Sequence, residues 1–102
     1  MKIIASKENL VNALRRANCA IASRVMLPIL SNVMFSVTDG KLTVTATDNE
    51  ISITTSIPCL VEEEGSTTLP AKKLMQIISA LPEGDVSIES DSNDISTITC
   101  QF

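Results

Sequence analysis

Apolar residues recur three or four positions apart in two segments of the chain, a spacing typical of amphipathic helices. In the first segment the stripe consists of Leu10, Ala13, Leu14, Ala17 and Ile21. In the second segment it consists of Leu74, Ile77, Ile78 and Leu81. Ser6 can cap the first helix, whereas Pro70 can begin the second and Pro82 can end it. The pattern predicts helices over residues 7–20 and 71–81.

Elsewhere apolar and polar residues alternate, which indicates half-buried strands. Such stretches cover residues 2–5, 29–37, 42–47, 51–57, 66–69, 86–88 and 95–102. The pair Asp39-Gly40 is a strong hairpin signal between the second and third of them, and Asp48-Asn49 marks the next reversal. We expect the acidic segment Glu62 to Gly65 to be a loop between two halves of the chain.

The order of these elements suggests an internal repeat. Residues 1–61 give strand, helix and three strands, whereas residues 62–102 give strand, helix and two strands. We therefore predict an α+β fold of two pseudo-repeats, with two helices packed on antiparallel sheets and the last strand of the second repeat missing.

Composition excludes several classes of function. The 102 residues fit one domain, and they include no His, Trp or Tyr. A catalytic system of Ser or Cys with His cannot be assembled, and aromatic platforms for single-stranded nucleic acid are lacking. Cys19, Cys59 and Cys100 have no metal-binding spacing and are expected to be reduced structural thiols. We expect a cytoplasmic protein without metal, cofactor or membrane span, because its apolar stretches are short and it lacks a signal-peptide pattern.

The charges are segregated, although the net charge of −4 argues against ordinary nucleic-acid binding. Five of the eight basic residues fall in the two predicted helices or in the segment after the first. They are Arg15, Arg16, Arg24, Lys72 and Lys73. On helical wheels, Arg15 and Lys72 lie opposite the apolar stripes. Such faces suit phosphate contacts that carry no base information, although a solvated charged face is the common alternative.

The acidic residues have a plainer explanation. Asp48 and Glu50 flank a turn, and Glu62 to Glu64 form a run; either group could in principle bind a hard cation. Turn formation and solubility account for them better.

Several ordered motifs resemble the first domain of the bacterial DNA polymerase III beta subunit, the replicative sliding clamp. Leu27-Pro28-Ile29-Leu30 is similar to the family's LPIL stretch, and Thr47-Asp48-Asn49-Glu50 to its T-D-x-E turn. Pro70-Ala71-Lys72-Lys73 resembles the opening of its second helix, and Leu81-Pro82-Glu83-Gly84 the exit from that helix. Their order and spacing extend the resemblance over nearly the whole chain.

The resemblance implies a DNA-clamp fold, three such domains per chain, and two chains closed head to tail into a ring around duplex DNA. It implies a non-catalytic subunit whose partners are double-stranded DNA, a second clamp chain, the clamp loader and DNA polymerases. Arg24 matches a DNA-contacting arginine, and Arg15, Arg16, Lys72 and Lys73 lie on the matching helices. Ser23, Val25 and Met26 depart from the family's usual Gly, Pro and Thr. The second and third clamp domains would be absent from this chain.

Two other functions compete with this interpretation. A stand-alone adaptor could bind peptides along an open sheet edge at residues 95–100. A small hydrolase could use the carboxylates of Asp48 and Glu50, although nothing in the sequence supplies a pocket for them.

Overall fold

The computed structural model describes residues 1–19, 32–47, 51–93 and 95–101. Two helices, α1 (Lys7–Asn18) and α2 (Ala71–Ser79), accompany eight strands. The strands are β1 (Lys2–Ser6), β2 (Asn32–Thr38), β3 (Lys41–Thr47), β4 (Ser52–Pro58), β5 (Leu60–Glu63), β6 (Gly65–Pro70), β7 (Asp85–Ser90) and β8 (Ser96–Gln101).

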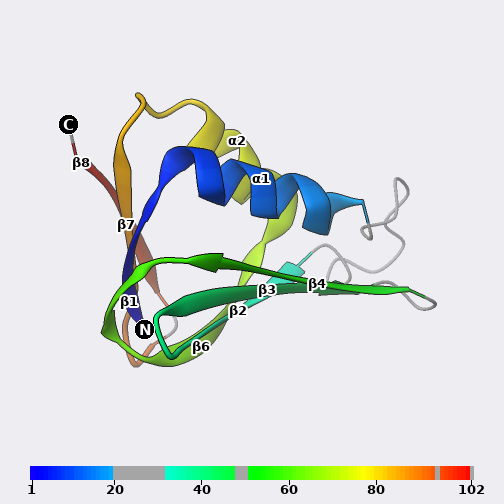
Figure 1. The fold of residues 1–102 in the computed structure, drawn as a ribbon, viewed down its shortest axis with the longest axis horizontal. Helices are drawn as coiled ribbons and strands as arrows, with labels where there is room; N and C mark the ends of the chain where they lie inside the picture. The colour runs from blue at the N-terminus through cyan, green and yellow to red at the C-terminus, as the bar shows by residue number, and fades with distance from the viewer. Residues whose placement is uncertain (20–31, 48–50, 94, 102) are drawn as a thin grey trace.

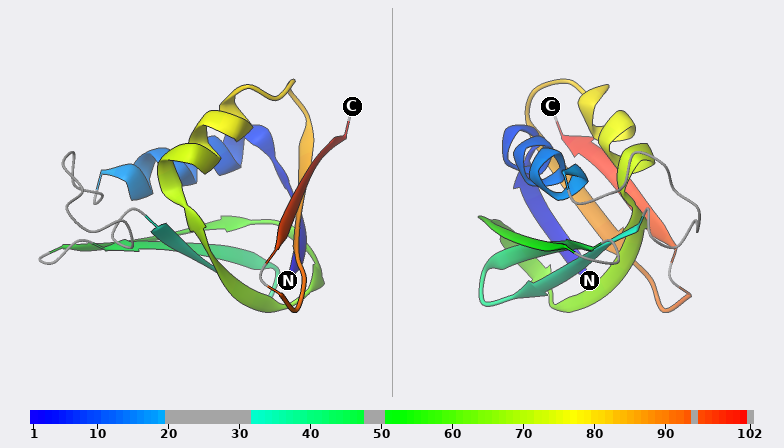
Figure 2. Two further views of the ribbon diagram at one scale, coloured as in Figure 1. Left: turned by 180° about the vertical axis from the view of Figure 1, so that it is seen from behind. Right: turned by 90° about the vertical axis from the view of Figure 1, so that its right-hand side faces the viewer.

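The strands form two four-stranded antiparallel sheets, in the orders β5-β1-β7-β8 and β4-β3-β2-β6. The two helices lie together on one side of these sheets (Figure 1). Each helix connects one sheet to the other, because α1 leads from β1 to β2 and α2 leads from β6 to β7. The views in Figure 2 show the helices side by side from behind and from the end. The predicted α+β class, with two helices on two antiparallel sheets, is confirmed.

Alternating side chains of the strands and one face of each helix form the core. The predicted stripe of α1 is buried at Leu10, Ala13, Leu14 and Ala17, whereas Ile21 lies outside the described residues. The inward faces of β2 and β3 are buried as expected, at Val33, Phe35, Val37, Leu42, Val44 and Ala46. Phe35 is completely buried, and removing such a side chain from water contributes roughly 1.5–3 kcal/mol.

The turn between β2 and β3 has the geometry that its sequence predicts. Asp39 and Gly40 both have positive φ, at 53° and 74°. This is the pattern of a type I′ turn, whose twist matches the flanking strands. Pairing of Thr38 with Lys41 follows directly from it.

The acidic segment is not the loop that we expected. Leu60–Glu63 forms β5, which pairs with β1, and β6 begins at Gly65. Pairing with β1 overrides the low strand preference of glutamate, and the Lys2 ammonium lies 3.2 Å from a Glu62 carboxylate oxygen. The boundary between residues 61 and 62 therefore falls inside a strand, and the division into repeats stays a prediction.

Both helices end earlier than predicted within the described residues. Helix α1 ends at Asn18 and α2 at Ser79. Ile77, which we assigned to the buried stripe, is 41% exposed because it lies on the flank of α2 that faces β8. The described part of the strand predicted over residues 29–37 begins at Asn32.

Candidate nucleic-acid interface

The two helices run antiparallel, because α1 leads from one sheet to the other and α2 leads back. Ser6 caps α1 by accepting a hydrogen bond from the backbone N–H of Asn9. The next residue, Lys7, donates from Nζ to the carbonyl oxygen of Leu81 at 2.7 Å, and its backbone N–H donates to Gly84 at 2.9 Å. The beginning of α1 is thereby joined to the segment that leaves α2. The last turn of α1 and the first turn of α2 consequently lie toward the same end of the helix pair (Figures 1 and 2).

This arrangement gathers the predicted basic residues of the two helices at one end of the helix pair, which we call the basic end. Arg15 and Arg16 occupy the last turn of α1, and Lys72 and Lys73 occupy the first turn of α2. All four side chains are exposed. Arg24 lies outside the described residues, as do Asp48 and Glu50. The structure thus brings together four of the five basic residues that the sequence singled out.

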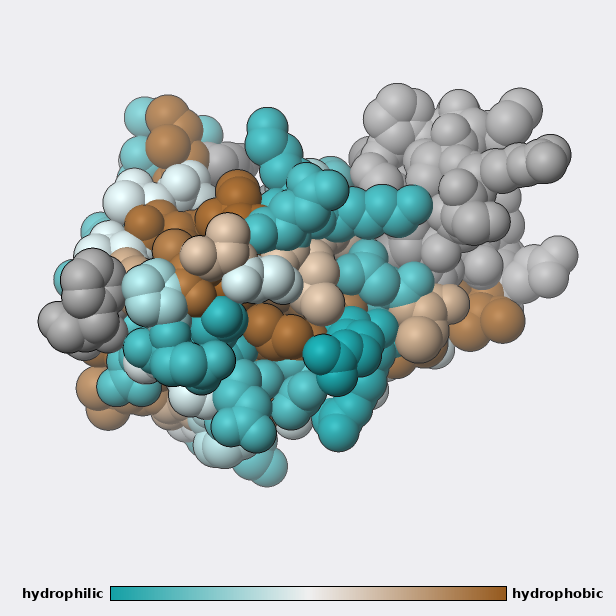
Figure 3. All heavy atoms as spheres, turned by 90° about the horizontal axis from the view of Figure 1, so that it is seen from above, coloured by the Kyte–Doolittle hydropathy of each residue, from teal (hydrophilic) through white to brown (hydrophobic). Residues whose placement is uncertain are grey.

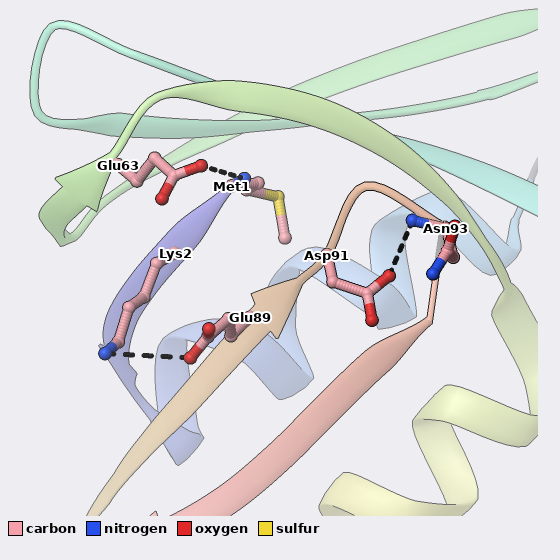
Figure 4. A network of polar contacts seen from close by, with 6 residues as sticks. All are labelled: Met1, Lys2, Glu63, Glu89, Asp91 and Asn93. Atoms are coloured by element: carbon pink, nitrogen blue, oxygen red, sulfur yellow. Dashed lines mark hydrogen bonds and ion pairs between the residues drawn. The ribbon is translucent and has the colours of Figure 1, made fainter.

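These four cations have no carboxylate partner within the described residues. Lys2, by contrast, is paired with Glu62 and Glu89, and Lys7 with Glu83 at 3.8 Å. The N-terminal ammonium is 3.4 Å from Glu63 (Figure 4). Most positive charge outside the basic end is therefore neutralised locally, with exposed Lys41 as an exception.

The two halves of the basic end differ in their relation to the helix dipole. Arg15 and Arg16 lie near the negative end of α1, where cations are stabilising. Lys72 and Lys73 lie near the positive end of α2, whose first turn contains no acid to balance them. The position of Lys72 and Lys73 is therefore unfavourable for folding. It does, however, place two lysine ammonium groups beside the free backbone N–H groups of the first turn, which attract anions.

The surface around these residues is mainly hydrophilic, with apolar patches between. Figure 3 looks down on the helices and shows hydrophilic side chains spread over this side of the molecule. The Arg15 guanidinium donates a hydrogen bond to Oδ1 of Asn12 at 3.5 Å, and it has no other side-chain partner in the part of the chain that the structure describes. A hollow of about 290 Å³ beside Arg15 is also lined by Lys7, Asn12 and Glu83. The mixed charges of its wall do not form an anion cradle, so phosphate contacts here would be superficial.

Among the described residues, one thiol is affected by burial and another contacts the backbone of α1. Burial raises the pKa of the Cys59 thiol, which disfavours the reactive thiolate. Cys19 is exposed directly after α1, and its thiol donates to the Arg15 carbonyl oxygen at 3.5 Å. Within the described ranges, no group of three Cys, Asp or Glu residues is arranged to hold a metal ion. The described helices are too short and too polar to cross a bilayer.

Sequence reasoning did not identify the role of Lys7. Its position directly after a capping serine identified it only as the first residue of a helix. A lysine near the start of a helix interacts unfavourably with the helix dipole. This mismatch was the feature of the sequence that could have indicated a hydrogen-bond partner elsewhere in the fold.

Comparison with known proteins gives a consistent result. Residues 1–101 match the family model for the DNA polymerase III beta subunit, N-terminal domain. The chain is 36% identical over 95 residues to the beta sliding clamp of Proteus mirabilis, covering 91% of this chain and 26% of that protein. It is 36% identical over 85 residues to the beta sliding clamp of Escherichia coli strain K12, covering 82% of this chain and 23% of that protein.

Solved structures agree over almost the full chain. The DNA polymerase sliding clamp of Caulobacter crescentus superposes with a TM-score of 0.91 at 30% identity, covering 99% of this chain and 28% of that one. The sliding clamp of Bacillus subtilis gives a TM-score of 0.92 at 28% identity, covering 99% and 29%. The chain spans about a quarter of the length of these relatives.

Proposed function

The chain belongs to the family of the DNA polymerase III beta subunit, N-terminal domain, and from that membership we propose that it supplies one domain of a sliding clamp on duplex DNA. In this role it makes or breaks no bond and acts as a processivity factor for a polymerase. Its hold on DNA would be topological when the ring is complete.

The basic end of the helix pair carries this proposal. Arg15, Arg16, Lys72 and Lys73 are exposed and lack acidic partners within the described residues. Long, flexible, unpaired cations neutralise phosphates without reading base edges. We keep Arg24 as a proposed DNA-contacting residue because of its position in the sequence motif. Weak contacts of this kind allow a ring to move along DNA.

The remaining partners follow from the family. We propose a second clamp chain, the clamp loader and DNA polymerases as partners of the complete clamp, with the remaining clamp domains completing the ring. We also propose that the protein works in the cytoplasm, without a cofactor.

The test is binding of the 102-residue chain to a short duplex, followed by fluorescence anisotropy at low salt. We expect weak, sequence-independent binding. The slope of log K against log salt should be no steeper than about −4.5, since five cations are proposed and each neutralised phosphate contributes about −0.9. The variant Arg15→Gln/Arg16→Gln/Lys72→Gln/Lys73→Gln should lose most of this binding.

Lys41→Gln is the control, because Lys41 is an exposed lysine on β3 rather than on a helix and has no carboxylate partner among the described residues. It should bind nearly as well as the unmodified chain. Equal losses in the control and in the helix variant would contradict the assignment of the interface. Tight binding to one duplex sequence would contradict the proposed mechanism.

A further inference from the structure

Helix α1 carries an acid and a base on the same outward line. Glu8 lies in its first turn and Arg15 in its last turn, and both side chains are exposed. Their separation in sequence is roughly 20° short of two full helical turns, so the two side chains point in nearly the same direction. Along the helix axis they are about 10.5 Å apart, because each residue adds about 1.5 Å. A ligand lying along this line meets an anion at one end and a cation at the other.

The surface between these two charges is continuous. Glu8 and Arg15 both line the hollow of about 290 Å³ on the outer side of α1. Asn12 lies between them on the same wall, and its Oδ1 accepts the hydrogen bond of 3.5 Å from the Arg15 guanidinium. The acid and the base therefore belong to one surface, and a duplex that contacts Arg15 comes within electrostatic reach of Glu8.

The negative charge of Glu8 is not neutralised locally. Glu8 is the only acid in the two described helices. Glu83, the other acid of the hollow, lies 3.8 Å from the Lys7 ammonium, whereas Glu8 forms no ion pair with any cation of the described residues. The start of α1 thus presents an unpaired anion, while the basic end of the helix pair presents unpaired cations.

We propose that Glu8 positions duplex DNA by repulsion, so that the phosphates are kept from the start of α1 and confined to the basic end. This inference rests on the proposed function and adds a positioning residue to it. A duplex carries one negative charge per about 1.7 Å of its axis, so a duplex laid along the whole of α1 would bring several phosphates close to the Glu8 carboxylate. A duplex that crosses α1 near Arg15 avoids this repulsion and keeps the attraction.

The size of the repulsion suits a contact that must stay weak. Two unit charges about 10 Å apart in water change a binding constant by about twofold. Such an effect biases where the duplex lies but does not prevent it from moving along its own axis. An acid in the first turn also interacts favourably with the dipole of α1. That interaction contributes to stability only, so an effect of Glu8 on DNA binding separates the two roles.

The test is fluorescence anisotropy of a short duplex with the 102-residue chain, from about 0.01 M to about 0.1 M salt, over which the screening length falls from about 30 to about 10 Å. Glu8→Gln removes the repulsion and should tighten binding about twofold at the lowest salt. Glu8→Lys also adds a cation on the line of Arg15 and should tighten binding at least about fourfold. The slope of log K against log salt should steepen by about 0.9 in Glu8→Lys, since one more phosphate is neutralised.

Glu89→Gln and Glu89→Lys are the matched controls, because they change the net charge by the same amounts. Glu89 is exposed on β7 next to the buried Ile88, so its side chain lies on the face of the sheet turned away from the core and the helices. These variants should leave the salt slope unchanged and alter affinity less than the Glu8 variants. Circular dichroism should show that all variants fold.

Equal changes at the two positions overturn the inference, since only the net charge would then matter. An unchanged affinity and slope in Glu8→Lys overturn it as well. If the basic-end variant Arg15→Gln/Arg16→Gln/Lys72→Gln/Lys73→Gln still loses binding in that case, the proposed function stands and only the role of Glu8 is refuted. Absence of any duplex binding by the unmodified chain and by Glu8→Lys contradicts both.

Discussion

The Lys7 ammonium lies 2.7 Å from the carbonyl oxygen of Leu81, across 74 positions of sequence. The contact connects the first residue of α1 to the segment after α2, and the Lys7 side chain is only 17% exposed. A charged donor thus satisfies a carbonyl that follows the last turn of a helix. The contact therefore joins the beginning of α1 to the end of α2 in the antiparallel helix pair.

Replacing Lys7 should therefore destabilise the protein. Lys7→Met keeps most of the aliphatic stem but removes the donor, leaving the Leu81 carbonyl without its charged partner. We expect a loss of about 1–2 kcal/mol in the free energy of unfolding, measured by urea denaturation. The exposed Lys41→Met should change stability by less than about 0.5 kcal/mol. Equal effects of the two substitutions would show that the contact with Leu81 contributes nothing.

The helix dipole predicts effects of opposite sign at the two halves of the basic end. Lys72→Glu places an anion in the first turn of α2 and should stabilise the fold by about 0.3–1 kcal/mol. Arg16→Glu places an anion in the last turn of α1 and should destabilise it by a similar amount. Both should weaken binding to duplex DNA. Denaturation at low and at high salt measures these changes in stability, which should become smaller as the salt concentration rises. If both substitutions changed the stability in the same direction, the explanation by the helix dipole would be contradicted.

Lys2 should titrate above its ordinary pKa of 10.5. A hydrogen bond and charge attraction from Glu62, together with the charge of Glu89, raise the pKa of this ammonium. Stability from these pairs should be fully present below about pH 10.5 and lost as the pH rises through the folded pKa. NMR titration should show a larger decrease in the Lys2 pKa for Glu62→Gln than for Glu89→Gln. Glu63→Gln is the control, since Glu63 pairs with the N-terminal ammonium.

The cap of α1 should contribute measurably to stability. Ser6→Ala removes the acceptor of the Asn9 N–H, a hydrogen bond of 3.1 Å. Loss of such a cap costs about 1 kcal/mol. Ser6→Thr keeps the hydroxyl and should retain most of the stability in the same denaturation measurement. If both variants lose the same amount, the hydroxyl does not act as a cap.

The sequence predicted those features that depend on neighbours along the chain. Alternation placed Val33, Phe35 and Val37 on one buried face, and Asp39-Gly40 predicted the hairpin turn. Helical spacing likewise placed Arg15 on the exposed face of its helix and Leu14 on the buried face. These patterns are local because side-chain direction repeats every two residues in a strand and about every 3.6 in a helix.

Only the tertiary structure decided features that depend on distant partners. Glu62 is in a strand because β1 supplies backbone hydrogen bonds and Lys2 supplies a cation, and neither is visible in the acidic run itself. Ile77 remains half exposed because it lies on the flank of α2 that faces β8. The basic end exists because α1 leads from one sheet to the other and α2 leads back, so that the last turn of α1 and the first turn of α2 lie toward the same end. The sequence determined which side chains face outward, whereas long-range contacts determined which of those side chains lie together, because periodicity fixes direction but not the partner element.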